Sequence, residues 1–173
     1  MNQAAIPRYL LKFFLFSAIS FFIGTLHGML QVMPPIRAWL DSIGSPYGGT
    51  PGHMIDPLAH AHMNLVGGVV LLAMGTTYYL VPILAERTIY SLKMVNYTFW
   101  CVLVGAYLFY ITQIVFGVWE GTLLNANPGA QPAVHRFYGP TTALASTIMG
   151  VGFWIYAVNI ALTLRGAFSA VQK

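Results

Sequence analysis

The chain has 173 residues, of which 57% are hydrophobic and only 7% are charged, and its formal net charge is +4. Soluble domains carry about a quarter charged residues, so this composition excludes a water-soluble globular protein and indicates an integral membrane protein. The basic residues form no run of the kind that binds nucleic acid, so we expect no nucleic-acid partner and interpret the positive charge as contact with anionic lipid.

Four segments are long and apolar enough to cross a bilayer as helices, which takes about 20 residues each. They are residues 9–33, 57–84, 92–119 and 134–164. We therefore predict an all-α fold, with residues 1–173 forming a single transmembrane domain built as a four-helix bundle. Residues 34–56 are rich in glycine, proline and serine, which predicts a surface turn between the first two helices.

The first apolar segment could be taken for a secretory signal. Its apolar run is long, no small-residue cleavage site is evident, and it contains His27 and Gln31. We therefore expect it to be a retained membrane span.

The distribution of lysine and arginine predicts the orientation of the bundle. With both termini in the cytoplasm, the opposite side holds only Arg37 and Arg136. The cytoplasmic side then holds the other six basic residues: Arg8, Lys12, Arg87, Lys93, Arg165 and Lys173. Because cytoplasmic loops of membrane proteins carry an excess of these residues, we predict cytoplasmic termini.

All five histidines fall in the half of the predicted bundle that faces away from the cytoplasm. They are His27 in the first span, His53 in the following segment, His60 and His62 at the start of the second span, and His135 at the start of the fourth. An ionisable side chain inside a membrane is costly and indicates a functional site. His53 and His135, at the edges, are equally compatible with ordinary interfacial residues.

Neutral imidazole is a common metal and haem ligand, so this group of histidines predicts a cofactor site. A haem with two histidine ligands needs imidazoles on facing helices and room for a flat ring. Gly24 and Gly28 flank His27 with the small-xxx-small spacing that lets helices approach closely. We therefore expect His27 to lie beside a cofactor.

His60 and His62 point to nearly opposite faces of one helix, because successive helical residues are about 100° apart. Gly67 and Gly75 share the face of His60, whereas Val66 and Val69 share that of His62. At most one of the two histidines can therefore be the axial ligand on a given side of a haem. Taken alone, this pattern of glycines favours His60 as the haem ligand.

Other polar residues add to this interpretation. Asp56 and Pro57 are suited to the cap and the first position of a helix. Arg37 and Arg136 lie on the histidine side and could pair with haem propionates, although ordinary interfacial arginines would look the same. Asn64, Gln113 and Asn159 are predicted to form hydrogen bonds between helices.

Copper is an alternative cofactor. Thioether and imidazole ligands together suit copper, and four methionines lie on the histidine side of the predicted bundle. They are Met29, Met33, Met54 and Met63. Methionine is also a common apolar filler, so this alternative predicts a copper-binding or assembly protein, and a purely structural membrane subunit is a third possibility.

The stretch "HMNLVGGVVLLAMGTTYYLVP", residues 62–82, resembles the second helix of the large subunit of bacterial nitric oxide reductase, in the haem-copper oxidase superfamily. The segment around Gln31, the helix after "YSLKM" and the last helix, ending in "TLRG", are similar in the same order. The resemblance extends over nearly the whole chain but matches only the first four of the twelve helices of that subunit.

The resemblance implies that His62 is an axial ligand of a low-spin b-type haem, whereas the glycine pattern favours His60, and both remain candidates. We expect His27 to supply the other ligand, with His135 or another chain as alternatives. The second ligand and the binuclear catalytic centre of the family lie on later helices, which the resemblance does not include. We therefore expect an electron-transfer subunit that is not catalytic by itself.

The resemblance also implies a setting for this subunit. It places the chain in a bacterial inner membrane, with the haem toward the periplasmic side. The expected partners are membrane lipid, other membrane subunits, and a periplasmic c-type cytochrome or quinol.

Overall fold

The computed structural model describes residues 7–45 and 47–171, with side chains to residue 165, and in this part of the chain all regular structure is helical. Four helices within it are long and apolar enough to cross a membrane: Arg8–Gln31, Pro51–Leu84, Leu92–Ala126 and Pro128–Arg165. The predictions of an all-α fold and of four spans are therefore confirmed.

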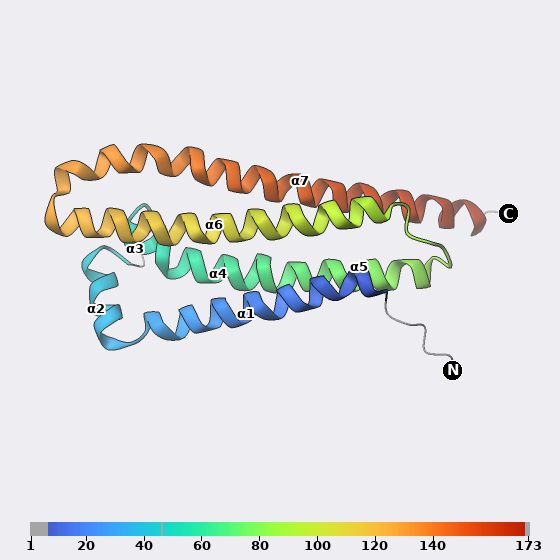
Figure 1. The fold of residues 1–173 in the computed structure, drawn as a ribbon, viewed down its shortest axis with the longest axis horizontal. Helices are drawn as coiled ribbons and strands as arrows, with labels where there is room; N and C mark the ends of the chain where they lie inside the picture. The colour runs from blue at the N-terminus through green and yellow to red at the C-terminus, as the bar shows by residue number, and fades with distance from the viewer. Residues whose placement is uncertain (1–6, 46, 172–173) are drawn as a thin grey trace.

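The four spans are built from shorter helical elements (Figure 1). The first joins a 3₁₀ turn, η1 (Arg8–Leu10), to α1 (Leu11–Gln31). The third is the single helix α6 (Leu92–Ala126), and the fourth joins η4 (Pro128–Ala130) to α7 (Gln131–Val171). The second alternates α-helix with wider π-helix, in the order α3 (Pro51–His53), η2 (Met54–Ala59), α4 (His60–His62), η3 (Met63–Val70) and α5 (Leu71–Leu84).

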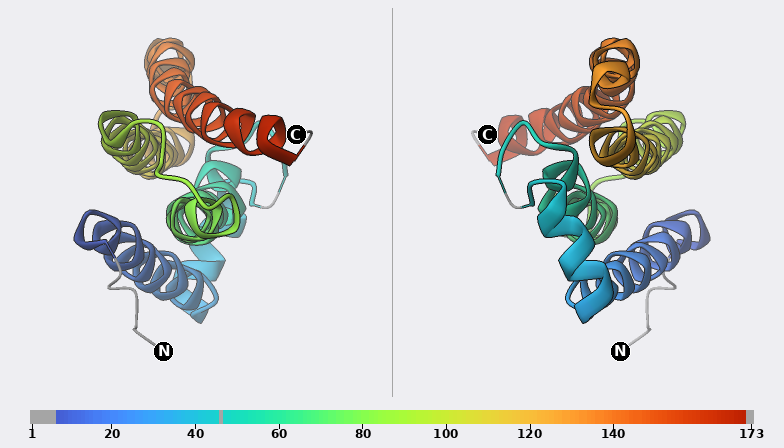
Figure 2. Two further views of the ribbon diagram at one scale, coloured as in Figure 1. Left: turned by 90° about the vertical axis from the view of Figure 1, so that its right-hand side faces the viewer. Right: turned by 90° about the vertical axis from the view of Figure 1, so that its left-hand side faces the viewer.

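Successive spans run in opposite directions along the bundle (Figures 1 and 2). Both ends of the described chain therefore lie at one end of the bundle, together with the turn at 85–91. The opposite end, which we call the distal end, carries α2 (Pro34–Ser42), α3 and η4. His27 lies about one turn before the distal end of α1, and the other histidines lie near the distal starts of the second and fourth spans.

The segment at 34–56 is largely helical, so the prediction of a surface turn there was wrong. Pro34 and Pro35 occupy the first positions of α2, where a missing N–H leaves no hydrogen bond unmade. Leu40 and Ile43 are fully buried and pack on Ile55 of the second span. This contact holds α2 and the turn after it against the distal end of the bundle.

The second span also begins earlier than predicted. Thr50 caps it by accepting a hydrogen bond from the backbone N–H of His53 at 3.2 Å, and Pro51 follows at the first helical position. The predicted start at Asp56 is instead an internal break, with φ −128° and ψ 111°. α6 and the fourth span likewise extend past their predicted distal ends, because helical hydrogen bonds continue where the apolar sequence has stopped.

The main core lies near the end of the bundle that holds the termini. Phe13 of α1 packs edge-on against Phe99 and Tyr78, with ring centroids 5.0 and 5.9 Å apart, and all three side chains are buried. The Tyr78 hydroxyl lies 3.0 Å from the hydroxyl of Thr98, so this buried polar atom is paired. These residues join α1, α5 and α6 into one packed unit.

The sequence predicts hydrogen bonds between helices at three residues, and the structure has them at two. Asn159 of α7 bonds both the backbone N–H and the carbonyl of Ser91, at 3.1 and 3.0 Å. Gln113 of α6 accepts a hydrogen bond from the Tyr138 hydroxyl at 3.0 Å. Asn64 differs, because its Oδ1 is buried and has no hydrogen-bond partner in the described part of the chain.

Candidate functional site

The candidate site is centred on the second span. His60 and His62 belong to a single α-helical turn, α4, that lies between two π-helical segments, η2 and η3. A π-helical turn widens the helix and re-aims the side chains next to it, and such turns are frequent at functional sites. The local geometry of this span is therefore unusual where its histidines lie.

The two histidines face opposite sides, as predicted. The ring of His60 lies toward α1, with its centroid 5.7 Å from that of His27 and the ring planes at 75°. The ring of His62 lies over Phe109 of α6, with centroids 4.5 Å apart and planes at 32°. The structure therefore brings His27 together with His60, and it does not bring together the expected ligand pair of His27 and His62.

A backbone hydrogen bond selects the tautomer of the neutral His62 ring. Its Nδ1 lies 2.9 Å from the carbonyl oxygen of Leu58. A carbonyl oxygen only accepts, so Nδ1 carries the proton, and in the neutral ring Nε2 then keeps its lone pair. A metal-ligating histidine is typically oriented by this kind of second hydrogen bond. In the neutral ring of His62, Nε2 is therefore the nitrogen that keeps a lone pair.

His27 and His60 have a different environment. The Nδ1 of His27 lies 3.4 Å from the hydroxyl of Tyr110 on α6. The Nδ1 of His60 is buried, and the described residues offer it no hydrogen-bond partner. Both imidazoles are half-buried between α1, α4 and α6.

The glycines around these rings do not leave a gap for a macrocycle. A Cβ added at Gly24 would overlap the side chain of Asn64, and one added at Gly28 would lie 3.6 Å from Cδ2 of His60. On the second span, a Cβ at Gly67 would lie 2.7 Å from Oγ of Ser20. The room predicted from the glycines is filled by protein side chains. A haem therefore does not fit between α1 and the second span, whereas His62 faces away from this contact.

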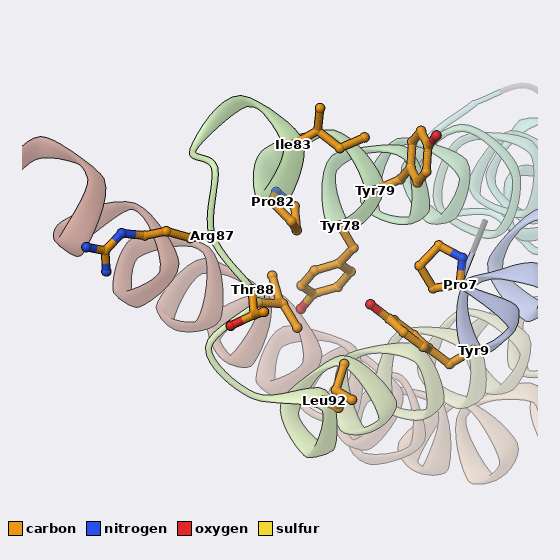
Figure 3. Close-up of a pocket in the computed structure, with 10 residues that line it drawn as sticks. Pro7, Tyr9, Tyr78, Tyr79, Pro82, Ile83, Arg87, Thr88 and Leu92 are labelled. Carbon is orange, nitrogen blue, oxygen red and sulfur yellow. The ribbon is translucent and has the colours of Figure 1, made fainter. Parts of the chain in front are cut away.

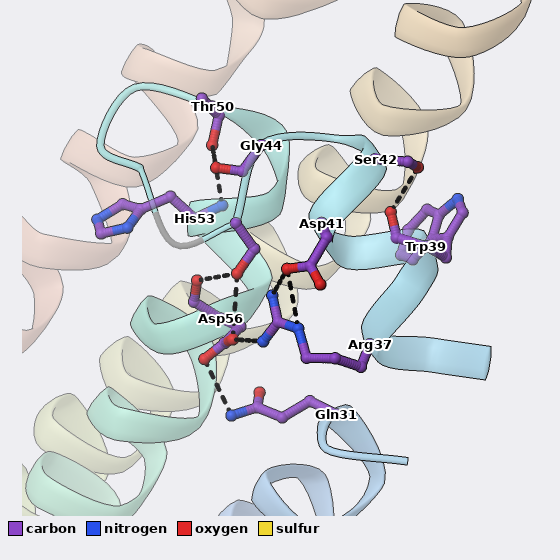
Figure 4. A network of polar contacts seen from close by, with 10 residues as sticks. Gln31, Arg37, Trp39, Asp41, Ser42, Gly44, Thr50, His53 and Asp56 are labelled. Atoms are coloured by element: carbon purple, nitrogen blue, oxygen red, sulfur yellow. Dashed lines mark hydrogen bonds and ion pairs between the residues drawn. The ribbon is translucent and has the colours of Figure 1, made fainter. Parts of the chain in front are cut away.

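Arg37 holds the distal end together (Figure 4). Its Nη1 donates to Asp56 Oδ2 at 2.5 Å, while Nε and Nη2 donate to Asp41 at 3.0 and 2.5 Å. Gln31 and Ser45 also donate to the Asp56 carboxylate, at 3.0 and 3.1 Å. The hydrogen bonds to Asp41 and Asp56 raise the pKa of Arg37. The Nε, Nη1 and Nη2 donors of its guanidinium are all directed at these two carboxylates.

His135 lies at the distal end of the fourth span, beside the side chain of Glu120 on α6. Its Nδ1 is 2.9 Å from Oε2 of Glu120, whose side chain is completely buried, while the imidazole is 53% exposed. Gln131 donates to the same oxygen at 3.3 Å. Arg136 is exposed and lies over the ring of Phe137 at 4.7 Å. The structure therefore places His135 and Arg136 apart from His60 and His62.

The predicted copper ligands are dispersed. Met29 and Met33 are 68% and 50% exposed on α1 and the turn after it. Met54 packs with Phe116, whereas Met63 lies near Gly67. Within the described residues, no three histidine, cysteine, aspartate or glutamate side chains form a group that could hold a metal ion.

A cavity of about 410 Å³ lies at the end of the bundle that holds the termini (Figure 3). Apolar and aromatic residues line most of it, among them Tyr9, Tyr78 and Pro82, with Arg87 at one side. No histidine is among the residues that line it. The buried Phe13 lies between this cavity and the histidines, so the cavity is separate from the site in α4.

These features define a helical membrane protein with four spans that carries imidazoles in and beside its spans. The chain belongs to the family of cytochrome c and quinol oxidase polypeptide I, whose sequence model matches residues 3–138. The predicted resemblance to subunit I of haem-copper oxidases is therefore confirmed for the N-terminal part of that family.

Relatives in bacteria agree with this assignment. The chain is 29% identical over 126 residues to a cytochrome c oxidase subunit 1 homolog, bacteroid, of Bradyrhizobium diazoefficiens, a match that covers 66% of this chain and 23% of that protein. It is 28% identical over 120 residues to cytochrome c oxidase subunit 1 of Rhodobacter capsulatus, covering 67% and 22%. A cbb3-type subunit, CcoN1, of Stutzerimonas stutzeri matches over 70 residues at 27% identity, covering 40% and 15%. The chain thus corresponds to less than a quarter of the length of these relatives.

Proposed function

We propose that this chain is a b-type haem-binding subunit that transfers electrons within a larger membrane oxidoreductase, with His62 as an axial ligand. The observation that carries the proposal is the hydrogen bond between His62 Nδ1 and the Leu58 carbonyl, since it leaves Nε2 as the ligating atom. The membership in the oxidase subunit I family supports a haem as the group that is bound.

His62, rather than His60, is the proposed ligand for two reasons. The residues that resemble the family motif begin at His62, and His60 is packed against His27 in a contact that leaves no space for a macrocycle. His27 pairs with His60, and His135 pairs with Glu120. We therefore assign the second axial ligand to another chain of the complex, which was one of the alternatives from the sequence.

A haem held by His62 would supply one-electron chemistry. The residues of this chain would hold the ligating imidazole in place. Leu58 orients the imidazole of His62, and Phe109 packs against one face of that ring. The buried aromatic cluster around Phe13 keeps the packing of α1, α5 and α6 fixed below it.

Partners in the membrane are part of the proposal. In its most apolar window, the fourth span is only 17% buried, against 50% for the third, so α7 presents an apolar face that lipid or another subunit would cover. The basic residues at the end with the termini support a cytoplasmic location for that end in a bacterial inner membrane. The distal end and His62 would then face the periplasm, where a c-type cytochrome or a quinol would exchange electrons.

A copper-binding or assembly role is the alternative that the methionines suggested. It needs soft thioether and imidazole ligands at one place, and the four distal methionines are instead split between exposed and separately buried positions. The structure thus gives haem ligation by His62 more support than copper binding.

The reduced-minus-oxidised visible spectrum tests the proposal. The protein should be isolated from its native membrane in mild detergent, so that any partner chain stays attached. Sharp b-type bands are expected, together with iron in the metal analysis. A colourless preparation without iron, from a complex that is intact by size, would refute haem binding.

A further inference from the structure

The cavity at the end of the bundle that holds the termini has no part in the proposed function. Its walls come from three elements and include Tyr9 of η1, Pro82 of α5 and Leu92 of α6 (Figure 3). Its volume of about 410 Å³ lies within the range of roughly 300–1,000 Å³ that is usual for small-molecule sites. The cavity is therefore large enough to bind a ligand.

This cavity lies at the depth where the hydrocarbon of a membrane meets the lipid headgroups. The second span ends beside it, at Leu84, and residues of the following turn form part of its lining. Tyr9, Tyr78 and Tyr79 also line it. Tyrosines gather at this boundary in membrane proteins, because the ring is apolar and its hydroxyl is polar. An amphipathic ligand, with an apolar body and a polar head, matches this position.

Two hydroxyl groups are directed toward the interior of the cavity, those of Tyr9 and Tyr78 (Figure 3). The Tyr78 hydroxyl lies 3.0 Å from that of Thr98, so it already has a partner. The described residues offer no hydrogen-bond partner to the hydroxyl of Tyr9. Tyr9 can therefore donate a hydrogen bond to an oxygen of a ligand in this cavity.

The turn after α5 holds Arg87 at the rim of the cavity. Glu86 has the left-handed backbone conformation, with φ 50°, which is uncommon outside glycine. The backbone N–H of Glu86 then bonds the carbonyl of Ile83 at 3.3 Å, and that of Arg87 bonds the carbonyl of Pro82 at 3.0 Å. These two bonds form a Schellman cap. Because Pro82 is itself a wall of the cavity, the cap fixes the backbone of Arg87 beside it.

The guanidinium of Arg87 is free to bind an anion. Figure 3 shows the side chain extending from the turn away from the cavity, and it is exposed. Within the described residues it forms no ion pair with a carboxylate. Among these residues, Glu86 is the one acidic side chain at this end of the bundle, against five basic ones: Arg8, Lys12, Arg87, Lys93 and Arg165. A negatively charged head therefore matches the rim of the cavity.

We propose that this cavity binds an anionic phospholipid, with one acyl chain between Tyr9, Pro82 and Leu92 and the phosphate outside, at Arg87. The hydroxyl of Tyr9 would donate to the ester carbonyl that joins the chain to the head. A quinone also has an apolar tail, but it carries no charge for Arg87 to bind, and free phosphate has no apolar part to fill the cavity. This inference goes beyond the proposed function and does not depend on haem binding.

Photolabelling tests the site. The complex, isolated in mild detergent, would be incubated with phosphatidylglycerol that carries a diazirine on one acyl chain, or with phosphatidylcholine that carries the same group. Mass spectrometry then locates the labelled residues. The anionic lipid should label the lining of the cavity about 5-fold more than the zwitterionic one, as expected for one basic residue beside an anionic lipid. Equal labelling by the two lipids would refute the proposal.

Competitors at equal concentration distinguish the possible ligands. Unlabelled phosphatidylglycerol should remove the label, whereas inorganic phosphate and a short-chain ubiquinone should leave it. Removal by phosphate would show that the anion alone is bound, and removal by the quinone would show that the cavity takes a neutral ring. Either result would overturn the assignment to a phospholipid.

Two arginine variants test the contact with the phosphate. Arg87→Gln should lower labelling by phosphatidylglycerol about 5-fold, to the level of phosphatidylcholine. Arg8→Gln is the matched control, because Arg8 is an exposed arginine at the same end of the bundle and is not part of the lining of the cavity. No loss with Arg87→Gln, or the same loss with both variants, would contradict the proposal.

Two tryptophan variants test the place of the acyl chain. Leu92→Trp should fill the cavity and prevent labelling of Tyr9 and Pro82. Leu84→Trp, at a position that is 79% exposed and not part of the lining, should leave this labelling unchanged. If Leu92→Trp has no effect, the chain lies elsewhere and the proposal is wrong. The comparison of the two arginine variants stands by itself should Leu92→Trp fail to fold.

Discussion

His27 of α1 and His60 of α4 lie edge to face in the bundle, with their ring centroids 5.7 Å apart. His62, two residues further along the same helix, lies on the opposite side over Phe109. The two imidazoles of α4 therefore belong to different environments. The hydrogen bond to Leu58 selects the tautomer of His62, which is proposed as a haem ligand, whereas the ring of His60 lies against that of His27.

The pairing of Arg37 with Asp56 should stabilise the distal end. Asp56 is 13% exposed and accepts hydrogen bonds from Arg37, Gln31 and Ser45. Asp56→Asn should lower the free energy of unfolding by about 1–3 kcal/mol, because it weakens these bonds and leaves a partly buried guanidinium underpaired. Unfolding in mixed detergent micelles would measure the change.

Asp41 provides the control for this variant. It also pairs with Arg37, but its side chain is 58% exposed, so Asp41→Asn should cost about 0.5 kcal/mol or less. Equal effects of the two substitutions would contradict the account. Raising the pH cannot replace these substitutions as a test. Hydrogen bonding to Asp41 and Asp56 raises the pKa of Arg37, so the contribution of its ion pairs to stability is present at lower pH and is lost only in strong alkali, above that raised pKa.

The buried carboxylate of Glu120 should depend on His135. His135→Ala leaves Glu120 with only Gln131 as a hydrogen-bond donor among the described residues. The loss should be about 1–3 kcal/mol, since the buried Oε1 of Glu120, which lies 3.2 Å from His135 Nδ1, then lacks a partner among the described residues. Thermal unfolding of the detergent-solubilised protein measures it.

A double-mutant cycle with Glu120→Gln would assign this loss to the pair, because the effect of His135→Ala should shrink once its partner has been replaced. Arg136→Ala, next to His135 but exposed, should change stability by no more than about 0.5 kcal/mol. An equal cost for the Arg136 variant would indicate a general effect on the start of α7.

Close packing of α6 on α7 should depend on Gly105. A Cβ there would lie 2.6 Å from the backbone nitrogen of Met149, so the clash is with main chain that cannot turn away. Gly105→Ala should destabilise the bundle by about 1–3 kcal/mol through this overpacking. Gly150→Ala on α7 is the matched control, because no atom lies within 4 Å of a Cβ at that position. A cost at Gly150 as large as at Gly105 would refute this explanation.

The number of spans and their approximate positions could be predicted from the sequence, because a membrane helix needs a long apolar run whatever its neighbours are. The distal elements could not be predicted by the same rule. Residues 34–56 were interpreted as a turn from their glycines, prolines and serines, although prolines at the first positions also suit a helix such as α2. The cap at Thr50 similarly starts the second span before its apolar run.

The site was predictable in part. Helical geometry correctly separated His60 from His62, because side-chain direction depends only on position along one helix. Which residue fills the space beside a glycine depends on the facing helix, so the sequence did not reveal that Gly24 accommodates Asn64. The pairing of the buried Glu120 with the half-exposed His135 also depends on the three-dimensional arrangement of α6 and α7, which the sequence alone does not give.

The central claim is that His62 is a haem ligand and His60 is not. Its most direct test is the reduced-minus-oxidised spectrum of His62→Ala, compared with that of His60→Ala, in complexes isolated from the native membrane and matched for protein amount and size. We predict that His62→Ala abolishes the b-type bands, because no iron ligand remains on that face of α4, while His60→Ala retains them. Bands that survive in His62→Ala, or that are lost only in His60→Ala, would contradict the account.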